Sequence, residues 1–280
     1  MSSEPKLAAV IGWPVRQSVS PVLHSFWLKQ HGLKGAYVAL PIAPENFTRC
    51  VAALPLMGFT GANVTVPHKE DAVALASDLD EDARATKAVN TLVFADQRIR
   101  GLNTDVRGFA ASLSESFGDD LVRSGPAVVL GAGGAARAIV HALTRAGAPE
   151  VRLVNRTKAR AETLAAQSQG GRVNVGSWGE WEKIFRDARL LVNTTSLGMK
   201  GKPSLDLSLD SLPREAAVAD IVYNPLQTDL LAKAKARGHP TMDGLGMLMH
   251  QAVPAFAAWF GVVPKVTPQL RAELERALSA

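Results

Sequence analysis

Residues 128–137 read V-V-L-G-A-G-G-A-A-R, a short apolar run that enters a cluster of glycines and continues as a helix-forming segment. Gly131, Gly133 and Ala136 occupy the three small-residue positions of the pattern G-x-G-x-x-G/A. The first glycine permits a tight turn, the second lets a pyrophosphate approach the backbone, and the small third residue lets the helix pack on its strand. The stretch predicts a strand over 127–130, a helix over 135–146 and phosphate contacts from Gly131, Ala132, Gly133, Gly134 and Ala135.

The segment after the next predicted strand indicates which dinucleotide this turn holds. Units that bind NAD usually place Asp or Glu about 20 residues further on, where it accepts hydrogen bonds from the adenosine ribose. Here the strand over 150–154 is followed by Asn155, Arg156, Thr157, Lys158 and Arg160. No carboxylate is present to repel a phosphate, and Arg binds phosphate in a planar, bidentate way.

The alternative is that Thr157 only caps a helix whose first turn is basic and solvated. Cations in a first turn oppose the helix dipole, and a bound phosphate compensates that cost. The sequence therefore favours NADP(H) over NAD as the cofactor.

Composition bounds the class of protein. The 280 residues suffice for one or two domains with a sizeable core. The net charge of +5 is dispersed, without a Lys/Arg block, and aromatics are 6% of residues, which argues against nucleic acid as a partner and suits an anionic substrate. A single cysteine, Cys50, excludes a disulfide within the chain, and no metal site is predicted. The N-terminus M-S-S-E-P-K has no apolar signal core and no long apolar run follows, so we expect a cytoplasmic protein without a membrane partner.

The chain before the glycine cluster alternates predicted strands and helices, which indicates an α/β domain with a mostly parallel sheet. The expected strands cover residues 7–11, 37–40 and 61–66, and a hairpin covers 89–94 and 98–102. The expected helices cover 21–31 with Ser20 as N-cap, 44–56, a segment from Pro67, and 78–87. Ligands collect at the carboxyl ends of parallel strands, so polar site residues are expected in the loops there.

Those loops carry hydroxyl, amide and charged side chains. Ser18 and Ser20 lie two residues apart before a helix and form a candidate cradle for a carboxylate. Each polar residue of these loops, taken alone, also has an ordinary interpretation as a turn or cap residue. Together they form a set that suits the binding of a small polyhydroxy acid. The set continues with Asn63 and Thr65, Lys69 in the expected first turn of a helix, Asn90 and Thr91, and Asn103, Thr104 and Asp105.

The remaining segments complete a second α/β domain around the glycine cluster. Expected strands cover residues 172–175, 189–193 and 217–222, and expected helices cover 106–117, 226–237, a segment from 243 through 251, and 270–278. The predicted fold class is α/β with two domains. Residues 1–105 plus 245–280 form a mostly parallel α/β substrate-binding domain, and residues 106–244 form a Rossmann NADP-binding domain.

Seven motifs resemble the shikimate dehydrogenase family, and the match runs in order across the chain from residue 11 to 251. They are S-V-S-P, N-V-T-V-P-H-K, A-V-N-T, N-T-D, G-A-G-G-A-A-R-A, N-R-T and D-G-x-x-M-L-x-x-Q. The resemblance implies an oxidoreductase acting on a CH–OH group, which reduces 3-dehydroshikimate to shikimate with NADPH on the way to chorismate and the aromatic amino acids.

Carried over by position, the resemblance also implies site residues. Lys69, paired with Asp105, is the acid/base residue. The substrate carboxylate is held by Ser18, Ser20 and Tyr223, and the ring hydroxyls by Thr65, Asn90, Asp105 and Gln251. The adenosine phosphate is held by Asn155, Arg156, Thr157 and Arg160, with Ile221 and Gly244 near the nicotinamide. Trp13 and Gln17 depart from common members at positions that flank the carboxylate site.

The chemistry of Lys69 follows from general principles. Hydride transfer to a ketone builds negative charge on its oxygen, which a Lys ammonium stabilises and protonates. Two rival hypotheses stay open: a quinate/shikimate dehydrogenase with broader substrate and cofactor use, and a non-catalytic sensor of shikimate-like acids. The sequence leaves the choice between monomer and homodimer undecided.

Overall fold

The computed structural model describes residues 4–168 and 170–279. It divides into two compact units, Met1–Thr104 with Leu248–Ala280 (the first unit) and Asp105–Met247 (the second unit). The sequence placed the divisions after residue 105 and before residue 245. Residues 1–3 of the N-terminal stretch examined for a signal segment lie outside the described residues. Among the helices of the described residues, none has both the length and the apolar character needed to cross a membrane.

The first unit is built on a mixed sheet in the order β2-β1-β3-β5-β6-β4. The central strand β1 pairs in parallel with β2 and with β3, while β5 runs antiparallel to β3 and forms a hairpin with β6. The hairpin turns at Asp96 and Gln97, both at positive φ. The strands are β1 (Lys6–Gly12), β2 (Gly35–Pro41), β3 (Phe59–Val64), β4 (Asp78–Leu79), β5 (Thr91–Ala95) and β6 (Arg98–Leu102).

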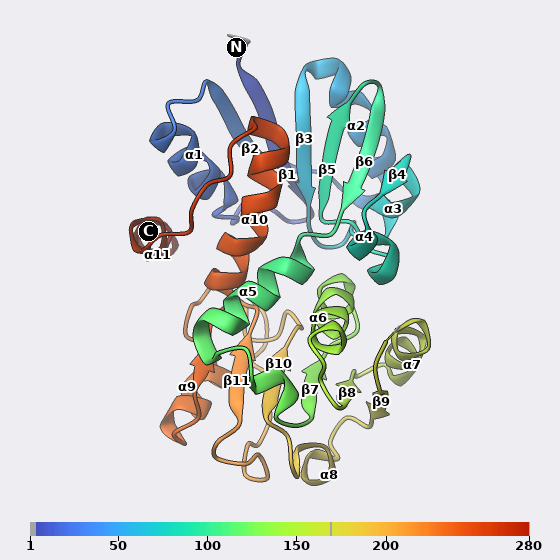
Figure 1. The fold of residues 1–280 in the computed structure, drawn as a ribbon, viewed down its shortest axis with the longest axis vertical. Helices are drawn as coiled ribbons and strands as arrows, with labels where there is room; N and C mark the ends of the chain where they lie inside the picture. Colours follow the sequence, from blue (N-terminus) through green and yellow to red (C-terminus); the bar gives the residue numbers. More distant parts are fainter. Residues whose placement is uncertain (1–3, 169, 280) are drawn as a thin grey trace. The chain divides into compact units, whose positions relative to one another are not determined.

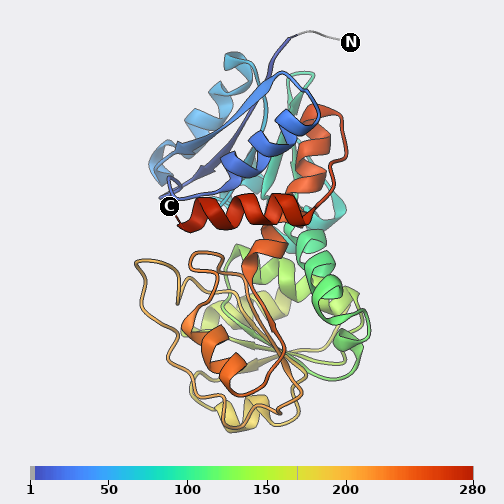
Figure 2. The same cartoon turned by 90° about the vertical axis from the view of Figure 1, so that its left-hand side faces the viewer.

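Helices cover this sheet, and their apolar sides form its core around Ile11, Phe47 and Leu92, none of them more than 1% exposed. The helix α11, dark red in Figure 2, packs against α1. The helices are α1 (Ser20–Gln30), α2 (Phe47–Ala53) between the 3-10 turns Pro44–Asn46 and Pro55–Met57, α3 (Asp71–Leu75), α4 (Glu81–Thr86), α10 (Gly244–Phe260), which begins in the second unit, and α11 (Pro268–Ser279).

Two local predictions in the first unit are wrong. Ser20 is not the N-cap of α1 but its first residue, and Val19 stands at the cap position. Ser18 takes over part of the cap's role, because its Oγ accepts a hydrogen bond from the Ser20 N–H at 3.2 Å. The helix expected from Pro67 begins only at Asp71, so Lys69 lies in the turn before α3 rather than in a helix.

The delayed start of α3 has a physical cause in His68. Its ring is fully buried, stacks on Phe47 with centroids 4.4 Å apart, and places Nε2 2.8 Å from the Ile42 carbonyl oxygen. The backbone reaches this position through a turn, in which the His68 N–H donates to the Thr65 carbonyl at 3.0 Å. β3 ends at Val64, so Thr65 belongs to this same loop.

The expected helix over 78–87 is also only partly right, because its first residues form the short strand β4 beside β6. Asp80 then caps α4 by accepting a hydrogen bond from the Ala83 N–H at 2.7 Å.

In the second unit, the helix expected from residue 226 begins at Asp229. Thr228 is its N-cap and accepts from the Leu231 N–H at 3.3 Å.

The second unit contains an all-parallel sheet in the order β12-β11-β10-β7-β8-β9 (Figure 1). Read from β9 to β12, this is the order 3-2-1-4-5-6 of doubly wound dinucleotide-binding folds, and the order reverses between β7 and β10. The strands are β7 (Ala127–Leu130), β8 (Val151–Val154), β9 (Val173–Gly176), β10 (Leu190–Asn193), β11 (Ala217–Asp220) and β12 (Thr241–Met242). The predicted two-domain α/β class with a Rossmann sheet is confirmed.

The helices of this unit lie on the sheet and close its core over the fully apolar strand β7, all of whose residues are buried. They are α5 (Asp105–Phe117), α6 (Gly134–Arg145), α7 (Lys158–Gln167), α8 (Trp181–Phe185) and α9 (Asp229–Ala236). In such a sheet the loops after β7 and β10 diverge and leave room for a ligand above the strand ends.

Candidate active site

A pair of serines lies in the segment between β1 and α1. Ser18 Oγ donates to Ser20 Oγ at 3.1 Å, and Ser20 is buried while Ser18 is half-buried. The two hydroxyls thus lie together at the N-terminus of an 11-residue helix, where the backbone also favours negative charge. Trp13 and Gln17, the two departures from the family pattern, are both exposed nearby in sequence.

The loop after β3 carries Thr65 and Lys69, both half-buried. The Thr65 N–H donates to the Ile11 carbonyl at 2.8 Å, which ties the loop to the end of β1. The Lys69 carbonyl accepts from the Val89 N–H at 2.8 Å, which ties it to the residue before Asn90. Two backbone hydrogen bonds therefore hold the backbone of this loop, including Lys69, to the segments that carry the other candidates.

Asn90, Thr104 and Gln251 form a hydrogen-bonded group that we call the amide cluster. Asn90 Nδ2 donates to Thr104 Oγ1 at 2.9 Å and to Gln251 Oε1 at 3.3 Å. The Thr104 N–H donates to Asn90 Oδ1 at 2.8 Å, and Gln251 Nε2 donates to the Leu248 carbonyl at 3.0 Å. All three residues are at most 8% exposed. The cluster joins the start of β5, the end of β6 and α10, and presents amides and a hydroxyl of the kind that bind ring hydroxyls.

Two other asparagines from the predicted polar set act inside the protein. Asn63 donates from Nδ2 to the Asn90 carbonyl and to Thr91 Oγ1, and accepts from Tyr37 Oη at 2.7 Å. Asn103 donates from Nδ2 to Thr86 Oγ1 at 2.8 Å and to the Ala88 carbonyl at 2.9 Å. Sequence reasoning missed Tyr37 in this network, since one tyrosine in an apolar strand carries no local signal of a polar partner.

A buried histidine lies under this region. His24 is fully buried, and its ring stacks on Tyr37 with centroids 4.0 Å apart and planes 10° apart. Loss of hydration lowers the pKa of His24 to about 3, although the nearby Asn63 side chain acts in the opposite direction. The ring is therefore neutral at physiological pH.

In the second unit, the turn after β7 combines a strained glycine with an open one. Gly131 has φ +110°, and a Cβ there would lie 2.6 Å from Thr194 Oγ1. Gly133 is the exposed residue before α6, and a Cβ there would meet no atom within 4 Å. The first glycine is needed by the protein's own backbone, and the second leaves space for a ligand at the helix N-terminus. Ala136 is fully buried against the core, as the pattern predicts.

The basic segment after β8 lies at the surface. Arg156, Thr157 and Arg160 are exposed, and Asn155 Nδ2 donates to the Thr157 carbonyl at 2.8 Å. Thr157 stands at the N-cap of α7, yet its side chain makes no capping hydrogen bond. Lys158 pairs with Glu162 at 3.8 Å. Thr157 therefore occupies the N-cap position, as the alternative predicts, but without a capping bond from its side chain, and its hydroxyl belongs to the same exposed segment as two guanidinium groups.

A buried carboxylate organises the loop after β11, and sequence reasoning missed it. Asp220 is fully buried and accepts hydrogen bonds from Asn193 Nδ2 at 2.9 Å, the Val222 N–H at 3.0 Å and Thr228 Oγ1 at 2.8 Å. Burial raises the pKa of Asp220 to about 6, against the effect of these donors. The carboxylate holds the turn that carries Ile221 and Tyr223.

Gly244 lies against that same turn. A Cβ at Gly244 would lie 2.1 Å from the Ile221 carbonyl oxygen, so only glycine allows the start of α10 to approach so closely. The Gly244 N–H donates to the Val222 carbonyl at 3.2 Å. The structure thus brings together Ile221 and Gly244, which lie 23 residues apart in the sequence.

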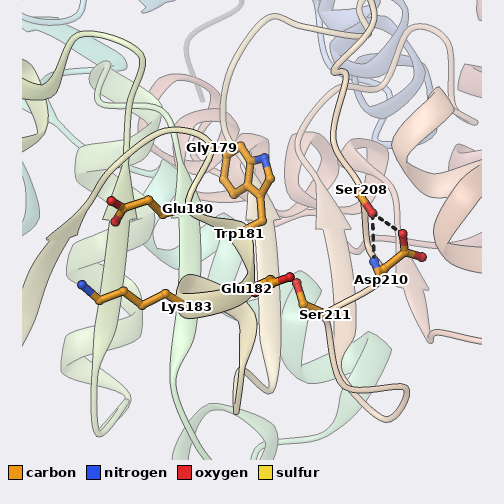
Figure 3. Close-up of a pocket in the computed structure, with 8 residues that line it drawn as sticks. All are labelled: Gly179, Glu180, Trp181, Glu182, Lys183, Ser208, Asp210 and Ser211. Carbon is orange, nitrogen blue, oxygen red and sulfur yellow. Dashed lines mark hydrogen bonds between the residues drawn. The ribbon is translucent and has the colours of Figure 1, made fainter.

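Two hollows elsewhere hold none of the predicted residues. One, of about 710 Å³ in the second unit, is lined by Trp181, Lys183, Ser208 and Asp210 among others (Figure 3). There Ser208 Oγ and Arg237 hold the pKa of the exposed Asp210 carboxyl below its usual range. The other, of about 760 Å³, lies in the first unit beside Phe26 and Glu273. Neither has the convergent hydroxyl and amide groups of the amide cluster.

Comparison with known proteins identifies the family. Residues 10–92 match the shikimate dehydrogenase substrate binding domain, and residues 115–199 match the family shikimate / quinate 5-dehydrogenase. The shikimate dehydrogenase (NADP(+)) of Paramagnetospirillum magneticum is 56% identical over 273 residues, which cover 97% of this chain and 99% of that protein.

Solved structures agree with this result. The shikimate dehydrogenase of Aquifex aeolicus matches with a TM-score of 0.88 at 34% identity and covers 100% of both chains. The shikimate 5-dehydrogenase of Thermus thermophilus, in complex with NADP(H) and shikimate, matches with a TM-score of 0.84 at 38% identity over 98% of both chains. The resemblance inferred from the motifs is confirmed, and the chain belongs to the shikimate dehydrogenase family.

Proposed function

We propose that this chain catalyses the reversible, NADPH-dependent reduction of 3-dehydroshikimate to shikimate, on the route to chorismate and the aromatic amino acids. Family membership supports the reaction class. The observation that carries the substrate is the amide cluster, in which a buried hydroxyl and two carboxamides converge beside a strand end. The cluster's own hydrogen bonds hold these groups in fixed orientations, and hydroxyl and carboxamide groups are the partners that a polyhydroxy ring needs.

Most of the substrate-binding residues in this proposal belong to the first unit, and Asp105 and Tyr223 belong to the second. Ser18 and Ser20 bind the substrate carboxylate, with Tyr223 as a further partner. Thr65, Asn90, Asp105 and Gln251 bind the ring hydroxyls. The second amide hydrogen of Gln251 Nε2 is a suitable donor, since one hydrogen goes to the Leu248 carbonyl and Oε1 already accepts from Asn90.

The second unit binds NADP(H), and its residues fit the cofactor's chemistry. The open position at Gly133 and the N-terminus of α6 suit a pyrophosphate. The exposed guanidinium groups of Arg156 and Arg160, with the hydroxyl of Thr157, suit the adenosine phosphate. Gly131, Ala132, Gly134, Ala135 and Asn155 shape the same loops, and Ile221 and Gly244 flank the nicotinamide.

Lys69 and Asp105 are the acid/base residues of the proposed mechanism. NADPH, when bound, supplies the hydride. The Lys69 ammonium stabilises negative charge on the substrate's ketone oxygen and gives it a proton, and the neutral amine takes the proton back in the oxidative direction. Asp105 accepts a hydrogen bond from a substrate hydroxyl and so orients the ring. The reaction closes with one C–H and one O–H bond formed and one cofactor molecule oxidised.

The first experiment follows NADP(H) absorbance with shikimate and with quinate, with NAD run in parallel, on the wild type and on Lys69→Ala. Shikimate turnover with NADP, lost in Lys69→Ala while shikimate still binds, is the expected result. Comparable turnover of quinate or NAD assigns the chain to the broader quinate/shikimate branch. Tight binding of shikimate without turnover would overturn the proposal that the chain is an enzyme and would support the hypothesis of a non-catalytic sensor.

We also propose a cytoplasmic location, which is supported by the single cysteine and by a reaction that draws on cellular NADPH. Sedimentation of the purified chain decides between monomer and homodimer. The dispersed net charge gives no reason to invoke a nucleic acid or a membrane as partner.

A further inference from the structure

A second layer of polar side chains lies behind the amide cluster, and the proposed reaction makes no direct use of it. Tyr37 on β2 is 4% exposed and donates its hydroxyl to Asn63 Oδ1 at 2.7 Å. Asn63 donates to Thr91 Oγ1 at 3.0 Å, and Thr91 Oγ1 donates to Asn90 Oδ1 at 3.2 Å. Three hydrogen bonds therefore lead from the edge of the sheet to the amide cluster.

The direction of this chain of hydrogen bonds is determined at Asn63. Both amide hydrogens of Asn63 are used, one toward Thr91 Oγ1 and one toward the Asn90 carbonyl at 3.2 Å. A flipped Asn63 would set its Oδ1 against that carbonyl oxygen, two acceptors in contact. The unflipped amide leaves Oδ1 to accept, and the Tyr37 O–H is the donor that satisfies it.

The same logic continues at Asn90. Its Oδ1 accepts from the Thr104 N–H at 2.8 Å and from Thr91 Oγ1 at 3.2 Å. Nδ2 is thereby directed to Thr104 Oγ1 and to Gln251 Oε1. The Thr104 N–H sets the orientation of the Asn90 amide, and the Thr91 hydroxyl supplies a second hydrogen bond that holds Oδ1 in place.

The ring of Tyr37 is itself held in place. It stacks on the fully buried His24, with centroids 4.0 Å apart, and lies 6.0 Å from the ring of Trp259. Close packing of this kind allows the phenol few alternative rotamers. The hydroxyl of Tyr37 is therefore presented to Asn63 in one direction.

We infer that Tyr37 is a positioning residue for substrate binding, acting through Asn63 and Thr91 on the amide of Asn90. The inference rests on the proposed function, in which Asn90 binds a ring hydroxyl. Outer partners that orient ligand-binding groups change affinity when they are removed, although they touch no ligand.

The test begins with Tyr37→Phe, which removes one oxygen and keeps the stacked ring. The expected result is a rise of roughly five- to tenfold in the KM and in the calorimetric Kd for shikimate, the size of one lost buried hydrogen bond. We expect the KM for NADP and the kcat to change less than about twofold, because Tyr37 acts in this inference on a group that binds a ring hydroxyl and not on the group that transfers the proton.

Thr60→Val is the matched structural control. Thr60 lies on the same strand as Asn63 and donates its hydroxyl to the Leu7 carbonyl at 3.0 Å, outside the network. The Thr60→Val variant should lose one hydrogen bond, and its Tm should fall about as much as that of Tyr37→Phe. Its KM for shikimate should stay at the wild-type value. At Thr91, the isosteric Thr91→Val raises that KM while Thr91→Ser, which keeps the hydroxyl, restores it, so the inference stays testable if Tyr37→Phe folds poorly.

The double variant Tyr37→Phe with Asn90→Ala separates action through Asn90 from general loosening. We expect Tyr37→Phe to add less than about twofold to the shikimate KM once Asn90 is truncated, because the group that it orients is gone. If the wild type is active, two results would overturn the inference but not the proposed function. One is a Tyr37→Phe variant with the same shikimate KM as Thr60→Val. The other is a double variant whose rise in shikimate KM equals the full product of the rises in Tyr37→Phe and Asn90→Ala. A wild type that neither binds nor turns over shikimate overturns the proposed function and the inference with it.

Discussion

Asn90 in the first unit and Arg156 in the second are both candidate ligand-binding residues, but the protein treats them differently. Asn90 is 3% exposed and its side chain is hydrogen-bonded to Thr91, Thr104 and Gln251, whereas the guanidinium of Arg156 is exposed at the surface. In the proposed function, the first unit uses buried polar groups to orient one small, uncharged face of a ligand. The second presents charge and bare backbone, which suit a flexible phosphorylated ligand.

In the proposed function, specificity for the substrate resides in the first unit, and the second unit contributes affinity for the cofactor. A preorganised set of neutral hydrogen-bonding groups rejects ligands that leave one of them unpaired, and so discriminates between similar acids. Exposed cations and helix N-termini bind any suitably placed phosphate and give affinity that depends on salt. Substitutions in the two units should therefore change different kinetic and binding constants.

The largest expected effect is that of Lys69→Ala in the first unit. We expect kcat for shikimate oxidation to fall roughly 10²- to 10⁴-fold, the usual contribution of one acid/base group, with the Kd for shikimate changed only a few fold. Stopped-flow turnover and calorimetry on the same sample measure both quantities. Lys34→Ala, at an exposed lysine of the same unit, serves as control, and an equal loss in both variants would contradict the assignment.

The second-largest expected effect is on cofactor binding in the second unit. Arg156→Ala should raise the KM for NADP roughly 10- to 100-fold by removing charge-assisted hydrogen bonds to the phosphate, and leave the KM for NAD nearly unchanged. Steady-state kinetics with each cofactor at two salt concentrations test it. Lys183→Ala, an exposed cation of the same unit, should leave both cofactors at wild-type values. An equal rise for NAD and NADP would disprove the phosphate role.

Two glycines of one turn should separate folding from binding. Gly131→Ala places a Cβ at φ +110° and 2.6 Å from Thr194 Oγ1, so we expect it to lower the free energy of unfolding by about 1–3 kcal/mol. Gly133→Ala meets no atom within 4 Å of its Cβ, so it should unfold like the wild type yet bind NADP several fold more weakly. Denaturant titration and fluorescence of bound NADPH distinguish the two; a stable Gly131→Ala would refute the assigned strain.

The smallest effects concern pH and have opposite signs in the two units. The pKa of His24 is lowered to about 3 by burial, so the first unit should lose stability as pH falls below the unfolded value of 6.5, by about 2 kcal/mol at pH 5. The pKa of Asp220 is raised to about 6, so the second unit loses stability as pH rises from about 4 to about 6, and acidification from pH 7 to 5 should recover about 1 kcal/mol.

Hydrogen exchange resolved by peptide measures these two slopes in one experiment. His24→Phe should flatten the pH dependence of β2 and α1, and Asp220→Asn should flatten that of β10 and β11. Each substitution is the control for the other, because they lie in different units. A single common pH slope for all peptides, unchanged by either variant, would rule out the assignment.

Much of the second unit was predictable from the sequence because its signals are local. The strand over 127–130, the turn at Gly131 and the helix that follows are contiguous, and their spacing alone encodes the geometry. The basic residues after β8 are likewise adjacent in the chain. In the first unit the strands β1, β2 and β3 were predictable, but the helix starts at Ser20 and Asp71 were not. The hydrogen bond from the Ser20 N–H to Ser18 and the burial of His68 account for these two helix starts.

The two-domain α/β class, the glycine turn, the preference for NADP and the family could all be inferred from the sequence, because each depends on residue types at short, regular spacings. Which polar residues serve the fold became apparent only from their contacts in the folded protein. Asn63 and Asn103 form internal hydrogen bonds, and Tyr37 and Asp220 join buried networks for which the sequence has no local signal. The physical reason is that a buried side chain takes its role from its hydrogen-bond partners. For Tyr37 and Asn90, the sheet and α10 bring into reach partners that lie 26 and 161 residues away in the sequence.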